Sequence, residues 1–192
     1  MIGLEHGKVA LYVHNPEWNK EAERTIKILK DILGNIVIEI AHVGSTAINC
    51  IKAKPIIDIA VAVADFSDII CYNQQLEKHG FYYRYAMDDA DNILRKKTDF
   101  TGINIRQLLY ACGGYYNGAN NLQTHFIHVV KADSTEWRNY INFRNYLNAH
   151  PNIAKEYETL KINLCAQFPD SREKYVAHKH NFIQGILNSV KS

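Results

Sequence analysis

Residues 41–63, AHVGSTAINCIKAKPIIDIAVAV, join a small polar turn at 44–46 to an apolar segment that contains a single acid, Asp58. The segment 56–63 is otherwise aliphatic, which predicts a strand near the centre of a sheet with both faces covered. Because side chains alternate along a strand, Asp58 shares its face with the small Ala60. A carboxylate is costly in a dry core, so we expect this end of the strand to be open to water, a cation or a ligand.

The turn at 44–46 supplies two hydroxyl groups and closely spaced backbone N–H groups. If a helix follows at about 46–52, these N–H groups suit a phosphate. Lys52 and Lys54 are close in sequence and would add positive charge. The candidate phosphate-binding residues of this stretch are Gly44, Ser45, Thr46 and Lys54.

The composition indicates an ordinary globular chain. Its 192 residues suit one domain, and a net charge of +2 gives no strong field toward nucleic acid or an anionic membrane. There is no run of about 18 apolar residues and no signal-peptide pattern, so a cytoplasmic protein is expected. The four cysteines form no Cys-x-x-Cys pair, and we expect them to be reduced core residues.

The hydrophobic periodicity predicts a mixed α/β front half. Residues 99–123 are ambiguous, because INIRQLLYA suits either a strand or a helix and GGYYNGANN has loop composition. The remaining elements are expected as strands at 8–13, 36–41, 56–63 and 125–130, an antiparallel pair at 81–86 and 92–97, and helices at 17–33 and 66–79.

From residue 133 onward the pattern is helical. Asp133 with Glu136 resembles a capping box, a second helix begins at Pro151, and a last helix is expected at about 171–189. We expect these helices to pack on the sheet, so that the chain forms one domain with a mixed-sheet core at 1–132 and C-terminal helices at 133–192. The predicted fold class is α/β, of the α+β kind.

A Gly-Ser turn followed about a dozen residues later by an acid on a strand resembles the nucleotidyltransferase superfamily. The resemblance implies a turn that holds nucleotide phosphates, and two strand acids at positions i and i+2 that grip a pair of divalent ions. This chain departs from that pattern, because position i+2 from Asp58 is Ala60. A single carboxylate suits one ion, expected to be Mg²⁺, that is also held by water and substrate phosphates.

Eight motifs spread over nearly the whole chain resemble the GrpB family, in that family's order. They are NPEW (15–18), HVGSTAI (42–48), AKPIIDI (53–59), THFIHVV (124–130), EW (136–137), FRNYLNAHP (143–151), YETLK (157–161) and FPDSREKY (168–175). The resemblance implies a nucleotidyltransferase-like mixed sheet flanked by helices, with the C-terminal helical segment packed on it. Residues 99–123 fit the family pattern least, and we expect a local lid or surface loop there.

The family resemblance adds further candidates. His125 and His128 are three residues apart on a strand and face opposite ways, so only one joins Asp58 unless a bulge intervenes, and we favour His128. An imidazole there would stand where the superfamily has its third acid, as a metal ligand or general base. His42 is a further candidate metal ligand. Arg95 and Arg144 are candidates for phosphate pairing, because a guanidinium holds two oxygens at once.

The leading hypothesis is a protein that binds a nucleotide or small phosphorylated molecule. It would transfer a nucleotidyl group to a small acceptor, with Asp58 and His128 as catalytic residues and a divalent metal. Two alternatives stay open. Ala60 favours a non-catalytic partner or regulatory module, and the three histidines favour a metal-dependent hydrolase. The sequence determines neither the acceptor nor the oligomeric state.

Overall fold

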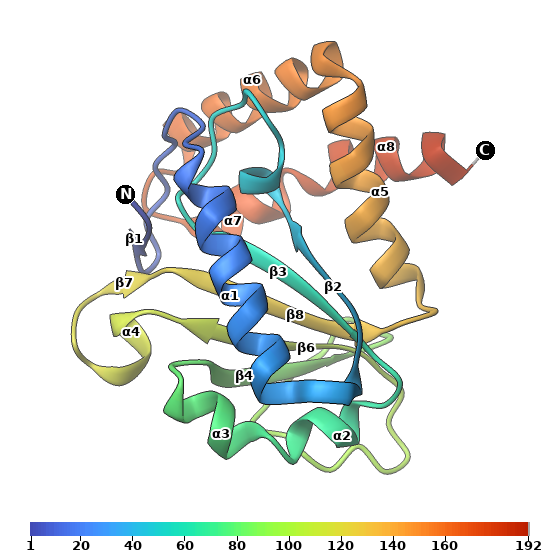
Figure 1. Cartoon of the computed structure of the whole chain (residues 1–192). Coiled ribbons are helices and arrows are strands. Elements are labelled where there is room, and N and C mark those ends of the chain that lie inside the picture. The colour runs from blue at the N-terminus through green and yellow to red at the C-terminus, as the bar shows by residue number, and fades with distance from the viewer. Residues whose placement is uncertain (192) are drawn as a thin grey trace.

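The computed structural model describes residues 1–191, and its centre is a six-stranded mixed sheet in the order β2-β3-β8-β6-β4-β5 (Figure 1). The strands are β2 (Val37–Val43), β3 (Ile57–Val63), β4 (Tyr82–Asp88), β5 (Ile93–Arg95), β6 (Ile105–Cys112) and β8 (His125–Lys131). β3 and β8 are parallel, and the other neighbouring pairs are antiparallel. β1 (Leu4–Glu5) and β7 (Leu122–Gln123) form a separate two-stranded sheet.

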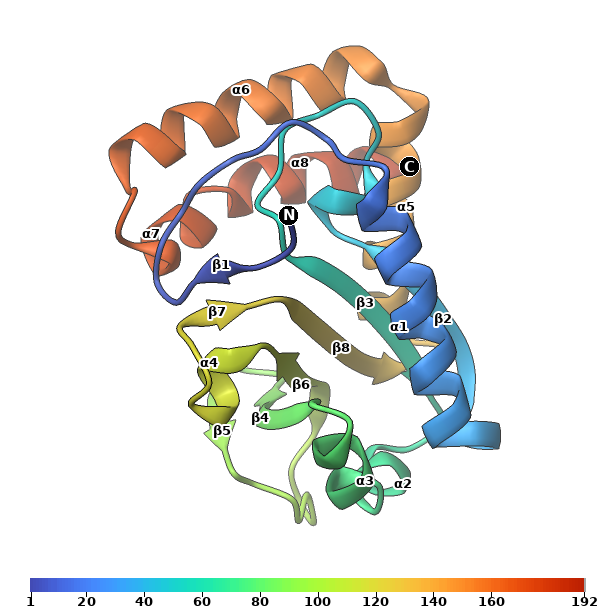
Figure 2. The ribbon, with the colours of Figure 1, turned by 60° about the vertical axis from the view of Figure 1, so that its left-hand side comes forward.

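Helices flank the sheet on both sides and extend beyond one end. Their bounds are α1 (Glu17–Leu33), α2 (Phe66–Ile70), α3 (Asn73–Lys78), α4 (Gly114–Asn117), α5 (Thr135–Ala149), α6 (Pro151–Gln167), α7 (Arg172–Ala177) and α8 (His180–Lys191). Figure 2 shows α6 and α8 at the opposite end of the molecule from α2 and α3. The predicted mixed sheet, with flanking helices and a helical C-terminal segment packed on it, is confirmed.

The first face of the sheet is covered by α1, with α2 and α3 beside it. The buried residues of α1 follow helical spacing and meet the aliphatic residues of β3 that alternate with Asp58, such as Ile59 and Val61. The helix ends at Gly34, which has a φ of +56°. Burial of this apolar stripe removes the largest hydrophobic cluster from water, and it fixes which face of β3 remains for Asp58.

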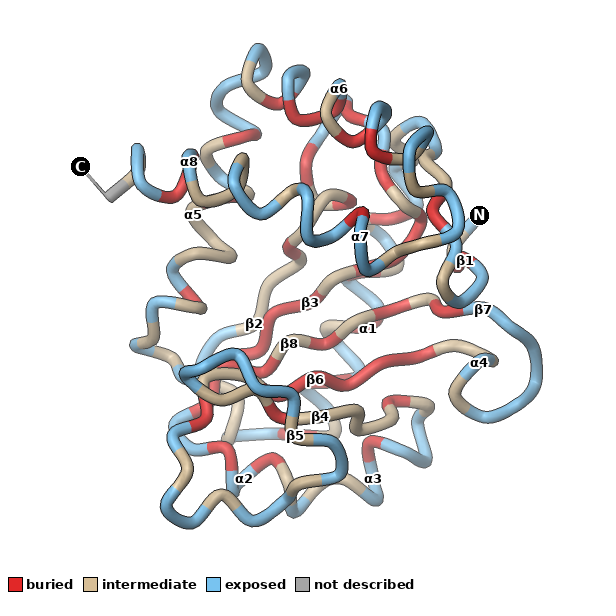
Figure 3. Tube along the Cα trace, turned by 180° about the vertical axis from the view of Figure 1, so that it is seen from behind, coloured by how far each residue is buried: buried red, intermediate tan, exposed pale blue. Residues whose placement is uncertain are grey.

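The second face of the sheet is only partly covered. Trp137 of α5 packs against Ala60 and Ala62 of β3, where small side chains let the helix approach. The other C-terminal helices pack on one another and on the segment that follows the turn at 44–46, in a cluster that contains Ile48. Figure 3 views the molecule from this side, where α7 and α8 run past a sheet whose central strands are largely buried.

Three predicted elements differ from the structure. Residues 8–13 form no regular strand, because Val9 packs on α6 and α7 and only Tyr12 bridges to Ala53. The helix predicted at 66–79 is interrupted between α2 and α3. Residues 99–123 are not simply a lid or surface loop, because they contain β6, whose Leu108 and Ala111 are fully buried in the sheet.

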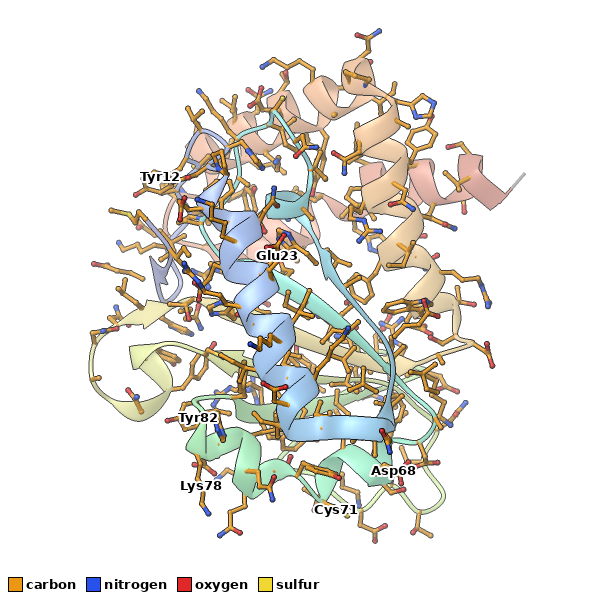
Figure 4. The ribbon with its side chains drawn as sticks, in the orientation of Figure 1. Tyr12, Glu23, Asp68, Cys71, Lys78 and Tyr82 are labelled. Carbon is orange, nitrogen blue, oxygen red and sulfur yellow. The ribbon has the colours of Figure 1, made fainter. Side chains whose placement is uncertain are left out.

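The helix boundaries and the cysteines also require correction. Ser134, and not Asp133, caps α5, since its hydroxyl accepts the Trp137 backbone N–H. The last predicted helix is divided into α7 and α8. Cys112 alone of the four free cysteines is buried, and the side chain of Cys71 lies at the outer surface (Figure 4). Among residues 1–191, no helix has the length and apolar character needed to cross a bilayer.

We expect Leu29→Ala to lower the free energy of unfolding by about 2–4 kcal/mol, because Leu29 is 1% exposed beneath α1 and truncation leaves a cavity. The neighbouring Ile28 is 41% exposed, so Ile28→Ala is a matched control that should cost less than about 1 kcal/mol. Urea unfolding followed by tryptophan fluorescence measures both values. Equal losses in the two variants would contradict the assigned helix face.

Candidate active site

The open part of the second face forms a cleft between the sheet and the C-terminal helices. Two adjoining cavities, of about 330 and 420 Å³, share the wall residues Ser45, Asp58, His128, Val176 and Lys179. Phe126, Leu109 and Tyr85 form part of the floor, because the strand register places them on the same face as Asp58. The cleft therefore lies where the sequence predicted that the sheet would be open.

Asp58 and His128 meet inside this cleft. The parallel pairing of β3 with β8 sets Ala60 opposite His128, so Asp58 and the imidazole project from the same face. His128 Nε2 lies 3.0 Å from Asp58 Oδ1, and the two side chains are 16% and 28% exposed. The carboxylate thus has a partner on one oxygen and remains accessible from the cleft.

A chain of hydrogen bonds behind His128 determines which ring nitrogen of the neutral imidazole carries the hydrogen. The Tyr140 hydroxyl donates to Gln107 Oε1 at 2.7 Å, which turns the Gln107 amide nitrogen toward His128 Nδ1 at 3.4 Å. Burial raises the pKa of Tyr140, so this hydroxyl stays protonated and available as a donor. In the neutral imidazole, Nδ1 is then the acceptor and Nε2–H donates to Asp58.

The turn at 44–46 presses its backbone directly against Asp58. Gly44 has a φ of +70°, and a Cβ added there would lie 2.6 Å from Asp58 Oδ2. Ser45 lines both cavities, so it is placed where a ligand would contact it. Thr46 is buried, and its hydroxyl bonds to His42 Nε2 at 2.9 Å, so this predicted phosphate ligand belongs instead to the wall behind the turn.

The condition set for phosphate binding, a helix at about 46–52, is not met, because only the single 3-10 turn η2 (Ser45–Ala47) follows Gly44. Ile48 and Ile51 beyond it are drawn into the apolar cluster of the C-terminal helices. The turn consequently offers its own amides and the Ser45 hydroxyl to the cleft, without a helix behind them.

Three cationic side chains line the cleft beside Asp58, and the sequence pattern predicted only one of them. Lys54 was a predicted phosphate ligand, whereas Lys179 and Arg172 were not singled out. The ammonium groups of Lys54 and Lys179 lie 5.2 and 4.6 Å from the centre of the Tyr175 ring. Burial, followed by the charges of Lys179 and Arg172, lowers the pKa of Lys54 well below its usual value. The motif FPDSREKY at 168–175 already contained Arg172 and Tyr175, so it was the available signal.

The other predicted histidines lie on the opposite face of the sheet. His42 is paired in register with Ile59, and burial lowers its pKa to about 4. His125 lies 3.2 Å from the Thr25 hydroxyl and 3.6 Å from Glu21 on α1. A three-histidine centre with His128 is therefore not assembled, which removes the geometric basis of the hydrolase alternative and of His42 as a partner of Asp58.

The two predicted arginines also lie apart from Asp58. Arg144 donates to the His42 carbonyl at 2.9 Å and to the Asn145 side chain, and it lines neither cavity of the cleft, so its placement as a phosphate ligand requires correction. Arg95 lines a further cavity that continues from the cleft along the sheet.

The ligand set does not fit a pair of divalent ions. In the part of the chain that the structure describes, no group of three His, Cys, Asp or Glu side chains is arranged to hold a metal. Asp58 is the single carboxylate on β3, its Oδ1 is engaged by His128, and Ala60 offers no ligand. Beside the Gly-Ser turn the protein thus offers one carboxylate, one imidazole and several cations, and the other carboxylate of the cleft, Glu136, lies 3.9 Å from the Arg106 guanidinium.

The segment between the turn and β3 is held by α6. The Lys52 backbone N–H donates to Glu158 Oε1 at 2.5 Å, and the buried Lys161 ammonium donates to the Lys52 carbonyl. These two contacts bracket Lys52, so they position the chain that carries Lys54 into the cleft. Burial, followed by the charge of Lys179, lowers the pKa of Lys161 to about 7.

The structure is a mixed α/β sheet with flanking helices, in which the β2–β3 connection sets a Gly-Ser turn against a strand acid, as the sequence predicted. The chain belongs to the GrpB family, since residues 8–189 match the family described as GrpB protein. The family membership that the sequence motifs predicted is confirmed.

Relatives of known sequence and structure agree with this membership. Glutamate-rich protein GrpB of Alkalihalophilus pseudofirmus is 34% identical over 192 residues, which cover 99% of this chain and all of the relative. The UPF0157 protein YqkA of Bacillus subtilis is 30% identical over 96% of this chain and 48% of its own length. The crystal structure of conserved protein GrpB from Enterococcus faecalis superimposes with a TM-score of 0.74 at 29% identity, covering 94% of this chain and 96% of that one.

We expect Gly44→Ala to be more destabilising than a substitution that adds only left-handed backbone strain. Gly80 has a φ of +85° with open space at the Cβ position, so Gly80→Ala measures the strain alone, about 1 kcal/mol. Gly44→Ala should cost at least about 1 kcal/mol more, because the methyl group displaces Asp58 and because a φ of +70° with a ψ of −167° is a backbone conformation that essentially only glycine adopts. Urea unfolding of both variants measures the difference in the free energy of unfolding. Equal losses would show that the Asp58 side chain moves away from the added methyl group without cost.

Lys161 should make stability depend on pH. Its pKa is about 7 in the folded chain against an ordinary 10.5, so between these values the unfolded chain binds a proton that the folded chain lacks. Folding therefore becomes more favourable as the pH rises through this window. Relative to Lys161→Met, the wild-type free energy of unfolding should rise by about 1 kcal/mol per pH unit between pH 7.5 and 9.5. A pH-independent difference would contradict this assignment.

Proposed function

We propose that the protein binds a nucleotide or another small phosphorylated molecule in the cleft. The observation that carries this proposal is the convergence of Lys54, Lys179 and Arg172 on one cavity with a single carboxylate, Asp58. Neither lysine side chain forms an ion pair with a carboxylate of residues 1–191, and their mutual repulsion contributes to the lowered pKa of Lys54. A phosphate near Ser45 would relieve that repulsion, since it brings negative charge between the two ammonium groups.

The organic part of the ligand has a suitable space on the other side of Asp58. The larger cavity extends between α5 and α8, where Phe143, Tyr157 and Leu187 line it and Asn139 supplies an amide. Apolar walls with a few polar groups are typical of small-molecule sites, and aromatic side chains favour flat rings. In this proposal a base or similar ring occupies this space, with its phosphate directed toward Lys54.

Asp58 and His128 would act on the bound phosphates. We propose Asp58 as the single protein ligand of an Mg²⁺ that accompanies the phosphates, and His128 as the group that holds Asp58 in position through Nε2–H. The acceptor hydroxyl would lose its proton to water in the cleft. The reaction class is nucleotidyl transfer to a small acceptor. The 3.0 Å contact between Asp58 and His128 supports this pairing of roles.

A non-catalytic module that binds the same ligand is the second candidate. Ala60 favours it, because a site with one strand carboxylate lacks the acid pair on which two-ion nucleotidyl transfer depends. In that case Asp58 and His128 would bind and orient the ligand without turning it over.

We expect Lys54→Gln and Lys179→Gln each to raise the Kd for ATP about tenfold, because each removes a charge that contacts phosphate. Lys78→Gln is the matched control, since Lys78 lies on α3 away from the cleft (Figure 4), and its Kd should stay within about twofold of wild type. Calorimetry with and without Mg²⁺ measures these values, and Asp58→Asn should abolish any gain from the metal.

The same samples distinguish transfer from binding alone. Pyrophosphate release from ATP that is lost in His128→Gln supports a nucleotidyltransferase, whereas tight binding without release supports the non-catalytic module. Absence of ATP, GTP, CTP and UTP binding by the wild-type protein would overturn the nucleotide proposal, and equal affinities in all three lysine variants would overturn the assigned phosphate position.

A further inference from the structure

A further cavity continues from the cleft along the sheet toward β5. It has a volume of about 330 Å³ and shares four wall residues with the cavity that contains Asp58, namely Tyr85, Leu109, Phe126 and Arg172. The two spaces are neighbouring compartments of one groove. We call the second one the arginine compartment, after the lining residues Arg84 and Arg95.

Arg84 and Arg95 have no anionic partner. Within residues 1–191, neither side chain forms a hydrogen bond or an ion pair. The Arg84 guanidinium lies 4.7 Å from the centre of the Tyr116 ring, a contact that fixes its position while leaving its N–H donors unused. Arg172 differs from both, since its guanidinium donates to the Gln123 side chain and to the Glu5 carbonyl.

The walls of the arginine compartment are strongly positive. Three guanidinium groups face a single carboxylate, Glu173, which is exposed at the rim. His6 stacks on Tyr115 with ring centres 4.0 Å apart and planes inclined by 6°. Burial and the charges of Arg172 and Arg84 lower the pKa of His6, so this imidazole adds a flat neutral surface and no compensating charge.

We infer, on the basis of the proposed function, that the arginine compartment binds a second anionic group, a phosphate or a carboxylate. The first phosphate then lies near Lys54 and Lys179, in the neighbouring compartment. Guanidinium groups pair with two oxygens of such an anion at once, and Arg84 and Arg95 have their donors available. The inferred ligand, or pair of ligands, therefore presents two separate anionic groups along one groove.

The second anionic group has two chemical sources. It is either the terminal phosphate of a nucleoside triphosphate, on the same molecule as the first phosphate, or an anionic group of the acceptor. Both sources use the same recognition by Arg84 and Arg95. They differ in whether the compartment is filled or stays free when a nucleoside triphosphate is bound.

The test compares Arg84→Gln/Arg95→Gln with the wild type by calorimetry in EDTA. The probes are AMP, ATP, and inorganic pyrophosphate added to protein saturated with AMP. Lys96→Gln/Lys97→Gln is the matched control, because it removes two positive charges next to Arg95 from residues that do not line the compartment. We expect the arginine variant to raise the Kd for ATP about tenfold while the Kd for AMP stays within about twofold.

Each outcome decides the inference. If Arg84→Gln/Arg95→Gln loses affinity for ATP and not for AMP, the compartment binds the terminal phosphate of the nucleotide. If its ATP affinity is unchanged and pyrophosphate binding is lost, the compartment binds an anionic group of the acceptor. Equal behaviour of the arginine and lysine variants overturns the inference. If the wild type binds neither nucleotide, the proposed function fails. Pyrophosphate binding to the free protein then decides the compartment, supporting it if Arg84→Gln/Arg95→Gln abolishes binding and overturning it otherwise.

Discussion

The carboxylate of Asp58, near the N-terminal end of the interior strand β3, is the constraint on which the site depends. One face of β3 is sealed by α1, and an unpartnered charge on the other face would be costly. The chain meets this cost with His128 on one oxygen and by leaving the second oxygen beside the Gly44 backbone at the wall of a cleft. The glycine is required there because any side chain would occupy the space that the carboxylate fills.

The cleft exists because the C-terminal helices cover only part of the second face. Trp137 packs on the sheet over the alanines of β3, whereas Arg172 of α7 and Lys179, in the turn between α7 and α8, line the open cleft. Residues more than a hundred positions apart in sequence thus meet around Asp58. The clamp of Glu158 and Lys161 on Lys52 has a similar effect, since it makes the position of Lys54 depend on the packing of α6.

Local patterns predicted much of the fold. The apolar stripe of α1, its end at Gly34 and the aliphatic run of β3 each determine their own structure, because burial follows directly from periodicity. The strand at 105–112 was ambiguous, since its continuous apolar run suits a buried helix equally well. Alternation along a strand predicted that only one of His125 and His128 would meet Asp58, and the choice of His128 came from the family resemblance. By contrast, the positions of His42 and Arg144, and the arrival of Lys179, depend on tertiary packing that no local spacing encodes.

The absence of a second strand acid at Ala60 and the presence of several cations in the cleft both make the net charge of the site more positive. In a two-ion site, strand acids offset the metal ions and the ions offset the phosphates. Here a carboxylate at position 60 would lie in register with His128 and two residues from Asp58, which would place two negative charges around one imidazole. With alanine instead, the wall keeps the excess positive charge of Lys54, Lys179 and Arg172. In the proposed function, side chains therefore carry part of the charge compensation that metal ions provide in a two-acid site, and binding should depend more on the lysines than on the ion.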